Sequence, residues 1–204
     1  MQFLLNQQLI TVSHLDPNMT VLNYLREEKQ RCGTKEGCAS GDCGACTVVV
    51  ASLEEDELKY QTVNSCLTLV SALHGKQLIT VEDLQEGQQL HPVQQAMVDN
   101  HASQCGFCTP GFVMSLFALM KHKGPGGHTE TEQALAGNLC RCTGYRPILQ
   151  AASDIMRQGT GQDQFLRQQA LTKKQLNAIQ TLEIQVLQQG ARVCYLPQNV
   201  TQLA

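Results

Sequence analysis

The stretch GCASGDCGAC, residues 37–46, places Cys38, Cys43 and Cys46 in a loop otherwise made of glycine, alanine, serine and one aspartate. A fourth cysteine, Cys66, follows beyond a segment that reads as a β-hairpin. The spacing C-x4-C-x2-C with a distant fourth cysteine is the plant-type pattern of a [2Fe–2S] site. The sequence around this loop therefore predicts that four thiolates hold a pair of irons.

The composition of the same loop suits a negatively charged metal centre. Two ferric irons, two sulfides and four thiolates sum to a charge of about −2, which must be stabilised away from bulk water. Backbone N–H groups of a tight loop can point at the sulfurs, and glycines allow close approach of the chain. We expect Asp42 to point outward, because a carboxylate facing the centre would be repelled. The alternative, a set of buried free cysteines, fits this spacing less well.

A second set of four cysteines has a different spacing, Cys105-x2-Cys108 and Cys140-x-Cys142. We interpret it as a second [2Fe–2S] site, but the spacing alone also fits tetrahedral zinc. A thioredoxin-like redox pair is disfavoured, because neither CxxC lies in a visible βαβ unit and each has two further cysteines at ligand spacing. A Rieske centre would need histidine ligands beside cysteines, and no Cys-x-His occurs.

Composition and charge narrow the class of protein. The chain has 204 residues, 42 % of them hydrophobic, and a formal net charge of −3, which gives no argument for binding nucleic acid or an anionic membrane. The sequence shows no apolar run of membrane-spanning length and no signal peptide. Ten cysteines in such a chain indicate reduced thiols that hold metal, and we expect a cytoplasmic protein.

The hydrophobic pattern predicts an α+β protein in three parts. Residues 1–87 read as strand-rich, residues 88–160 as helical, and residues 161–204 as a glutamine-rich tail. Strands of the first part are expected at Gln2–Leu5, Leu9–Val12, Thr47–Ser52, Tyr60–Asn64 and Gln77–Val81. Thr20 is expected to cap a short helix between the second and third of these strands.

Four short amphipathic helices are expected in the helical part, which is enough for a small bundle. Pro110 is expected in the first turn of the second helix, and Pro147 in that of the fourth. The sequence Thr129–Glu132 is typical of a capping box at the start of the third helix. One further helix is expected in the tail, at Thr172–Gln188.

Several motifs together resemble the xanthine dehydrogenase/aldehyde oxidase family of molybdenum hydroxylases. They are GTKEGCASGDCGACTV (33–48), NSCL (64–67), LHPVQQAM (90–97), QCGFCTPGFVM (104–114) and GNLCRCTGYRPI (137–148). The resemblance covers residues 1 to about 157 and favours a cluster over zinc at the second site. It implies a β-grasp ferredoxin-like [2Fe–2S] domain over residues 1–87 and a four-helix [2Fe–2S] domain over residues 88–160.

The resemblance also implies a direction of electron flow. In the family, the cluster of the helical domain lies beside the molybdopterin cofactor, and the ferredoxin-like cluster lies nearer the flavin. Electrons would run from a molybdopterin-binding large subunit through the second cysteine set to the first, and then to FAD and NAD. Gln104 matches the residue that contacts the pterin, and Cys142 is the ligand on that side. The chain itself is expected to carry no catalytic residue.

Within the family, the long segment between Cys46 and Cys66 favours the xanthine dehydrogenase branch, in which a small subunit carries both clusters and FAD. The alternatives are an aldehyde oxidoreductase or carbon monoxide dehydrogenase type, a structural zinc module and a free-standing ferredoxin-like carrier. The segment from Cys194 to Ala204 resembles the start of the family's FAD domain. We expect residues 161–204 to be a mobile or loosely docked linker, because they offer little apolar surface.

Overall fold

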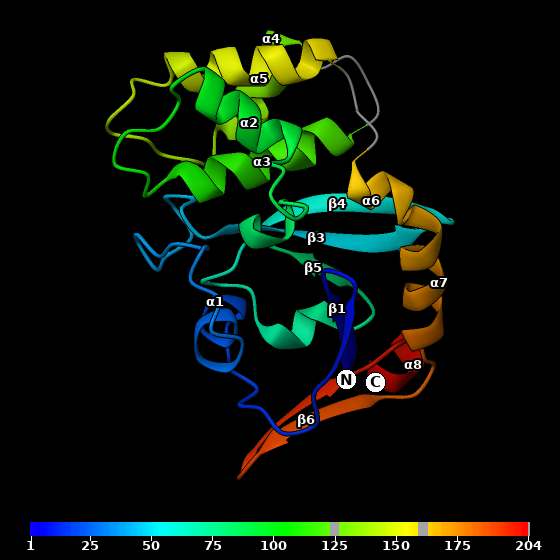
Figure 1. Ribbon diagram of the computed structural model, residues 1–204. Coiled ribbons are helices and arrows are strands. Elements are labelled where there is room, and N and C mark those ends of the chain that lie inside the picture. The colour runs from blue at the N-terminus through cyan, green and yellow to red at the C-terminus, as the bar shows by residue number, and fades with distance from the viewer. Residues whose placement is uncertain (123–126, 159–162, 204) are drawn as a thin grey trace.

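The computed structural model describes residues 1–122, 127–158 and 163–203. It is an α+β protein, as expected, with a five-stranded sheet, a group of helices on one side of it, and a tail that runs along its edge (Figure 1). The boundary expected between residues 160 and 161 lies outside the described residues.

The sheet has the strand order β2-β1-β5-β3-β4, in which β1 and β5 pair in parallel and the other neighbours pair antiparallel. Its strands are β1 (Gln2–Leu5), β2 (Gln8–Thr11), β3 (Thr47–Glu54), β4 (Glu57–Asn64) and β5 (Gln77–Ile79). Glu55 and Asp56 both adopt positive φ in the turn between β3 and β4, which matches the twist of a tight hairpin. Cys46 and Cys66 therefore stand just outside the two ends of this hairpin.

Both faces of the sheet are covered, which explains the unbroken buried run Thr47–Ala51 in β3. Val49 and Ala51 belong to the core shared with the helical group, whereas Val48 and Val50 belong to the core on the other face. Successive side chains of a strand point to opposite faces, so a strand covered on both sides is apolar throughout.

The second face packs against a short helix that leads to the first cysteine loop. Thr20 caps this helix as expected, since its Oγ1 accepts from the Asn23 N–H at 3.2 Å. Helix α1 (Val21–Asn23) continues directly into a π-helical turn, η1 (Tyr24–Glu28). The buried Leu25 of this turn joins the core of the second face.

The helical group consists of α2 (Pro92–Asp99), α3 (Thr109–Lys121), α4 (His128–Leu135) and α5 (Arg146–Gln158). Helix α3 contacts both the sheet and the other helices, so every residue from Gly111 to Met120 is buried and the helix is apolar all round. The cap of α4 lies two residues earlier than the expected Thr129, because Gly127 is the N-cap and its N–H donates to the Glu130 carboxylate at 2.9 Å. Within the described ranges, no helix is long and apolar enough to cross a membrane.

Strand β5 is shorter than expected. It ends at Ile79 instead of Val81, because the Thr80 N–H donates to the Asp83 carboxylate at 2.8 Å instead of to a neighbouring strand. The same carboxylate accepts from Arg31 at 2.7 Å. A 3-10 turn, η3 (Val81–Asp83), therefore leads from the sheet toward the helical group.

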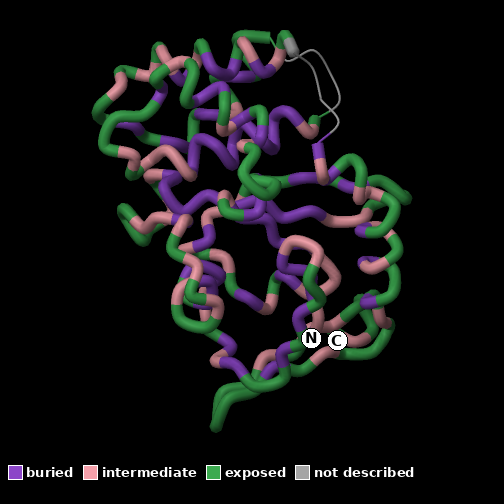
Figure 2. The backbone as a smooth tube through the Cα atoms, in the orientation of Figure 1, coloured by how far each residue is buried: buried purple, intermediate pink, exposed green. Residues whose placement is uncertain are grey.

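The tail contains α6 (Gln164–Arg167), α7 (Gln169–Ile179), β6 (Gln185–Gln189), β7 (Arg192–Leu196) and α8 (Val200–Leu203). The expected helix Thr172–Gln188 is wrong beyond Ile179, where the chain turns into a β-hairpin. Phe165 and Leu176 are buried in one core, and Leu187 in the other. Buried stretches alternate with exposed ones along the tail (Figure 2). The expectation of a loosely docked tail with little apolar surface is therefore wrong.

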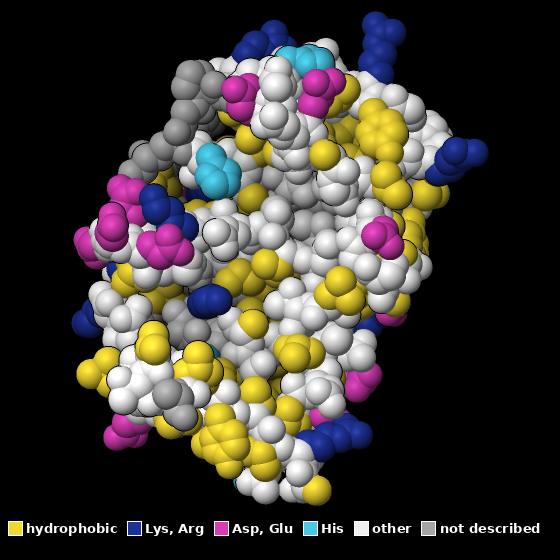
Figure 3. All heavy atoms as spheres, turned by 180° about the vertical axis from the view of Figure 1, so that it is seen from behind, with side chains coloured by type: hydrophobic (Ala, Val, Ile, Leu, Met, Phe, Trp, Pro, Cys, Tyr) yellow, Lys and Arg dark blue, Asp and Glu magenta, His cyan; other side chains and the backbone are white. Residues whose placement is uncertain are grey.

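The outer side of the tail carries apolar side chains that nothing in the described chain covers. Leu182, Val200, Leu203 and Tyr195 are each at least two-thirds exposed. Viewed from behind, hydrophobic side chains gather toward the lower end of the molecule, where the tail lies (Figure 3). The tail thus has one buried face and one apolar outer face.

Candidate metal centres

The first cysteine loop folds back on the sulfur of Cys38. The backbone N–H groups of Ser40, Asp42 and Cys43 each donate to Cys38 Sγ at 3.4 Å. Hydrogen bonds from Ser40, followed by those from Cys43, lower the pKa of Cys38 to about 6. The loop therefore favours the thiolate, which is the form that binds metal. The Asp42 side chain is exposed, as expected, and accepts from Ser40 Oγ at 2.8 Å.

The end of this loop is packed too tightly for a side chain. Gly44 has a φ of +68°, and a Cβ there would lie 2.2 Å from Gly137 O. Gly111, in the first turn of α3, approaches the same residue, since a Cβ at Gly111 would lie 2.1 Å from Gly44 O. The two glycines therefore let the first cysteine loop, α3 and the segment after α4 meet at backbone distance.

Cys46 and Cys66 meet at the open end of the β3–β4 hairpin, with their Sγ atoms 3.3 Å apart. Burial, followed by the hydrogen bond and charge of Cys46, raises the pKa of Cys66 to about 11. The charge of Cys38 acts on Cys66 in the same direction, so the three thiols lie within electrostatic reach of one another. Such thiols lose their protons when a metal ion takes them as ligands.

The second set gathers at the start of α3 and in the segment before α5. The Sγ atoms of Cys105 and Cys142 lie 3.5 Å apart. Burial, followed by a hydrogen bond with Cys140, raises the pKa of Cys108 to about 12. Burial acts to raise the pKa of Cys140, but hydrogen bonds from Thr143 outweigh this effect, so that the pKa is lowered. The four thiols thus form two contacting pairs, 105 with 142 and 108 with 140.

Two sulfur pairs, one in each set, have the separation of two thiolates that share a tetrahedral metal ion. Two thiolates on one tetrahedral metal, each about 2.3 Å from it, lie roughly 3.8 Å apart. The two measured pairs, at 3.3 and 3.5 Å, are close to that separation. In the part of the chain that the structure describes, no group of three or more His, Cys, Asp or Glu side chains lies close enough together to share one ion. All ten cysteines are free thiols.

A backbone hydrogen bond joins the two cysteine sets. The Leu139 N–H, next to Cys140, donates to Cys43 O at 3.0 Å. Phe107 of the second set's loop also approaches the first loop, since its Cε1 lies 3.7 Å from where a Cβ of Gly37 would be. A single backbone hydrogen bond therefore links Cys43 of the first set to Leu139, the residue before Cys140 of the second set.

One side of the second set faces solvent. Cys105 and Cys142 are exposed, and so is Gln104 beside them. Phe107 is 48 % exposed and Leu139 is 56 % exposed. The other two thiols of the set are half-buried or buried. The exposed thiols are thus bordered by apolar side chains on a surface that a partner could cover.

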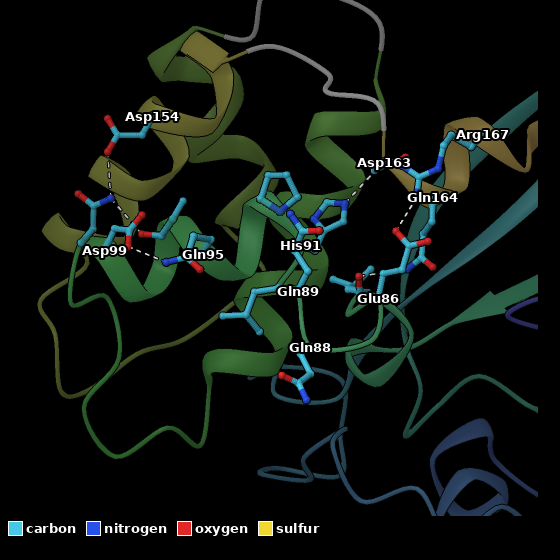
Figure 4. Close-up of a pocket in the computed structure, with 15 residues that line it drawn as sticks. Glu86, Gln88, Gln89, His91, Gln95, Asp99, Asp154, Asp163, Gln164 and Arg167 are labelled. Carbon is cyan, nitrogen blue, oxygen red and sulfur yellow. Dashed lines mark hydrogen bonds and ion pairs between the residues drawn. The ribbon is translucent and has the colours of Figure 1, made fainter.

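A separate cleft of about 690 Å³ lies between α2, α5 and α6 (Figure 4). Within the described residues its lining includes no cysteine. His91 and Asp163 point toward each other there, with His91 Nε2 3.0 Å from Asp163 Oδ2 (Figure 4). Lys121 Nζ donates to Asp163 Oδ1 at 2.7 Å. This buried contact attaches the tail to the helical group.

Sequence reasoning did not single out Asp163 or Asn138, although both are buried polar residues. Asn138 lies two residues before Cys140, and its side chain binds Gly44 of the first cysteine loop and Ser115 of α3. Its place two residues before Cys140 was the available signal. Asp163 carries no such signal, because its partners lie 42 and 72 residues away in the sequence.

Two family models match the chain. One, described as a 2Fe-2S iron-sulfur cluster binding domain, matches residues 3–71, and the other, described as a [2Fe-2S] binding domain, matches residues 80–153. Each range contains one of the two cysteine sets. The chain therefore contains two [2Fe–2S]-binding domains.

Curated relatives align with most of this chain. It is 48 % identical over 151 residues to xanthine dehydrogenase of Drosophila pseudoobscura pseudoobscura, 44 % over 159 residues to xanthine dehydrogenase/oxidase of Mus musculus, and 42 % over 158 residues to aldehyde oxidase 1 of Rattus norvegicus. These alignments cover 72 %, 77 % and 76 % of this chain, but only 11 % or 12 % of the relatives. The chain thus spans about a tenth of the length of the curated relatives it matches.

Solved structures show the same arrangement. Quinoline 2-oxidoreductase from Pseudomonas putida 86 matches with a TM-score of 0.66 and 32 % identity, covering 79 % of this chain and 97 % of that one. Aldehyde oxidoreductase from Desulfovibrio gigas matches with a TM-score of 0.68 and 26 % identity, covering 90 % of this chain and 19 % of that one. Sequence and structure thus agree on the same group of enzymes.

Proposed function

The chain belongs to the xanthine dehydrogenase/aldehyde oxidase family of molybdenum hydroxylases, as their iron–sulfur portion, and we propose that it relays electrons singly between a molybdopterin centre and a flavin. The observation that carries this proposal is the pair of four-cysteine sets joined by the hydrogen bond from Leu139 N–H to Cys43 O at 3.0 Å. A [2Fe–2S] cluster, when bound, supplies one reversible one-electron step. Two such sites in series can connect centres that exchange electrons in pairs.

Each cysteine set would hold one cluster. The first set is Cys38, Cys43, Cys46 and Cys66, and the second is Cys105, Cys108, Cys140 and Cys142. The contacting pairs support Cys46 with Cys66 on one iron, and Cys105 with Cys142 on another. The N–H groups around Cys38 would stabilise the negative charge of the first cluster. The sheet domain would thus act as a β-grasp ferredoxin and the helical group as a cluster-binding four-helix bundle.

Electrons would enter at the exposed side of the second set. There Gln104 would contact a pterin held by a molybdopterin-binding large subunit. The exposed Cys142 and the apolar side chains of Phe107 and Leu139 beside it support a partner surface at this point. Electrons would then cross toward Cys43 and leave from the first set to FAD and NAD.

The tail would connect this relay to the flavin. We propose domains at residues 1–87 and 88–160, and a linker with the start of an FAD-binding domain at residues 161–204. The exposed apolar side chains of Tyr195 and Val200 support a further domain that packs on the tail. FAD itself would be held by that further domain.

Among the members of the family, we favour a xanthine dehydrogenase that hydroxylates purines. The identities of 48 % and 44 % to xanthine dehydrogenases exceed the 42 % to aldehyde oxidase 1 by a small margin, so an aldehyde oxidoreductase is the alternative. The substrate would bind to the molybdopterin subunit and not to this chain. Ten free thiols agree with a reducing, cytoplasmic setting.

Iron and sulfide analysis of ligand variants tests the proposal. The wild-type chain is expected to bind about four irons and about four sulfides, since each site takes two of each. Cys66→Ser and Cys142→Ser should each lower the iron content to about half, whereas Cys32→Ser, outside both sets, should leave it unchanged. About two irons and one zinc per wild-type chain would instead identify a structural zinc module at the second site.

A further inference from the structure

Asn138 connects the two cysteine loops through its side chain. It lies two residues before Cys140 and is 3 % exposed. Its Nδ2 donates to Gly44 O at 3.0 Å and to Thr47 Oγ1 at 3.3 Å, both at the end of the first loop. Its Oδ1 accepts from Ser115 Oγ of α3 at 2.6 Å. One amide thus binds the first loop, the start of β3 and α3, while its own backbone belongs to the loop of the second set.

The orientation of this amide is fixed by its partners. Gly44 O can only accept, so the nitrogen of Asn138 must face it. Thr47 Oγ1 donates its own proton to Gly44 O at 2.7 Å, which leaves it free to accept from Asn138. Both donors of the amide and its oxygen are therefore satisfied. A buried polar network in which every group is satisfied specifies one arrangement of the segments that it joins.

The segments around Asn138 leave little room for another arrangement. Gly44 and Gly111 already meet at a distance that excludes a side chain. The neighbouring Leu139 N–H binds Cys43 O at 3.0 Å. A shift of the Asn138 side chain would therefore change the geometry of the backbone hydrogen bond between Leu139 and Cys43, which joins the two sets.

We propose that Asn138 is a positioning residue that fixes the separation and relative orientation of the two metal centres. It does so by holding the loop of Cys43 against the loop of Cys140. The inference rests on the proposed function, because the separation matters for electron exchange only if both sites hold clusters. The hydrogen bonds of the Asn138 side chain go to Gly44, Thr47 and Ser115 and not to a thiol, so its effect is on the geometry between the sites and not on the ligands of either.

The test compares Asn138→Leu with Asn100→Leu in the full chain. Leucine has the same number and branching of side-chain heavy atoms as asparagine, but it can neither donate nor accept a hydrogen bond. Asn100 is a matched control, because its Nδ2 also makes two hydrogen bonds, to Ala96 O at 3.0 Å and to Asp154 Oδ2 at 2.9 Å, within the helical group. Three quantities are measured: iron per chain, the spin–spin splitting between the two reduced clusters in low-temperature EPR, and hydrogen exchange of the peptide that contains Leu139.

Asn138→Leu is expected to keep the wild-type iron content and the separate EPR signal of each cluster. The spin–spin splitting should change, because magnetic coupling depends steeply on separation and orientation. Exchange of the Leu139 amide should become about tenfold faster, as expected for the loss of one supporting hydrogen bond. Asn100→Leu should leave both quantities at their wild-type values.

An unchanged splitting and unchanged exchange in Asn138→Leu would overturn the inference while leaving the proposed function intact. Loss of iron from one site would overturn it as well, because Asn138 would then maintain a ligand set and not a spacing. If Asn138→Leu does not fold, Ser115→Ala removes only the bond to Asn138 Oδ1 and should change the splitting and exchange in the same direction by less. Fewer than two clusters in the wild-type chain would refute the proposed function itself.

Discussion

At the scale of single residues, Gly44 allows the two cysteine loops and α3 to pack at backbone distance. Gly44 combines a left-handed backbone with direct contact to Gly137 O and to the backbone at Gly111. The left-handed conformation alone costs a non-glycine residue about 1–2 kcal/mol. A side chain at this position would also push apart the two cysteine loops, so the penalty has a conformational part and a packing part.

Gly44→Ala is therefore expected to lower the free energy of unfolding by more than the conformational cost of about 1–2 kcal/mol. Gly75→Ala is the matched control, since Gly75 has a φ of +73° but nothing within 4 Å of its would-be Cβ. Denaturant unfolding of both variants separates the conformational part of the penalty, which both share, from the packing part, which only Gly44→Ala has. Equal losses in the two variants would show that the contact with Gly137 is not tight.

Asp163 is the second residue on which the structure depends. Its burial acts to raise the pKa of the carboxyl, but hydrogen bonds from His91 and Lys121 outweigh this and hold the pKa at about 2. Burial in turn lowers the pKa of Lys121, against the opposing effect of Asp163. Because the carboxyl pKa in the folded chain lies below its ordinary value of 3.8, ionised Asp163 favours folding.

This stabilisation should be fully present above about pH 4 and should be lost as the pH falls through about 2, where the folded carboxyl takes up its proton. Asp163→Asn is expected to lower the free energy of unfolding by about 2–4 kcal/mol at pH 7, because it also leaves the buried Lys121 without its counter-charge. The difference between wild type and variant should shrink between pH 4 and pH 2. A difference for Asp163→Asn that stays constant between pH 4 and pH 2 would contradict the assignment.

At the scale of elements, the tail is a docked part of the molecule. Helix α6 packs Phe165 against Phe117 and His91, with the two phenylalanine ring centroids 4.9 Å apart. Helix α7 buries Leu176, and β6 buries Leu187 in the opposite core. The tail therefore stabilises both faces of the sheet.

Phe165→Ala is expected to lower the free energy of unfolding by about 3–5 kcal/mol, as for other large-to-small changes in a core. Leu182→Ala, at a position that is 82 % exposed, should change it by less than about 0.5 kcal/mol. Thermal or denaturant unfolding of the full chain measures both. A small effect of Phe165→Ala would mean that the tail contributes little to the fold.

The elements that follow from local patterns were predictable, and those that depend on distant partners were not. The hairpins of the sheet, the Thr20 cap and the helix that contains Pro110 agree with their sequence signals. The end of β5 depends on Asp83, and the docking of the tail depends on His91. Such contacts join residues far apart in sequence, and local periodicity carries no information about them.

At the scale of the whole molecule, the cysteine spacing predicted which residues gather but not how near the two sets lie. The four thiols of each set occupy one region, as the spacing indicated, and both are contained in family-matched domains. Their junction depends on Leu139, Asn138 and two glycines, none of which a spacing rule identifies. An electron relay between the two sets would therefore depend on how both cysteine loops pack together and not on either motif alone.

Low-temperature EPR of the chemically reduced chain tests the central claim most directly. If both cysteine sets hold [2Fe–2S] clusters, the spectrum will contain a pair of distinguishable S = 1/2 signals of equal intensity. Cys66→Ser should remove one of them and Cys142→Ser the other. A single signal in the wild-type chain, or none in a folded and fully reduced sample, would contradict the account.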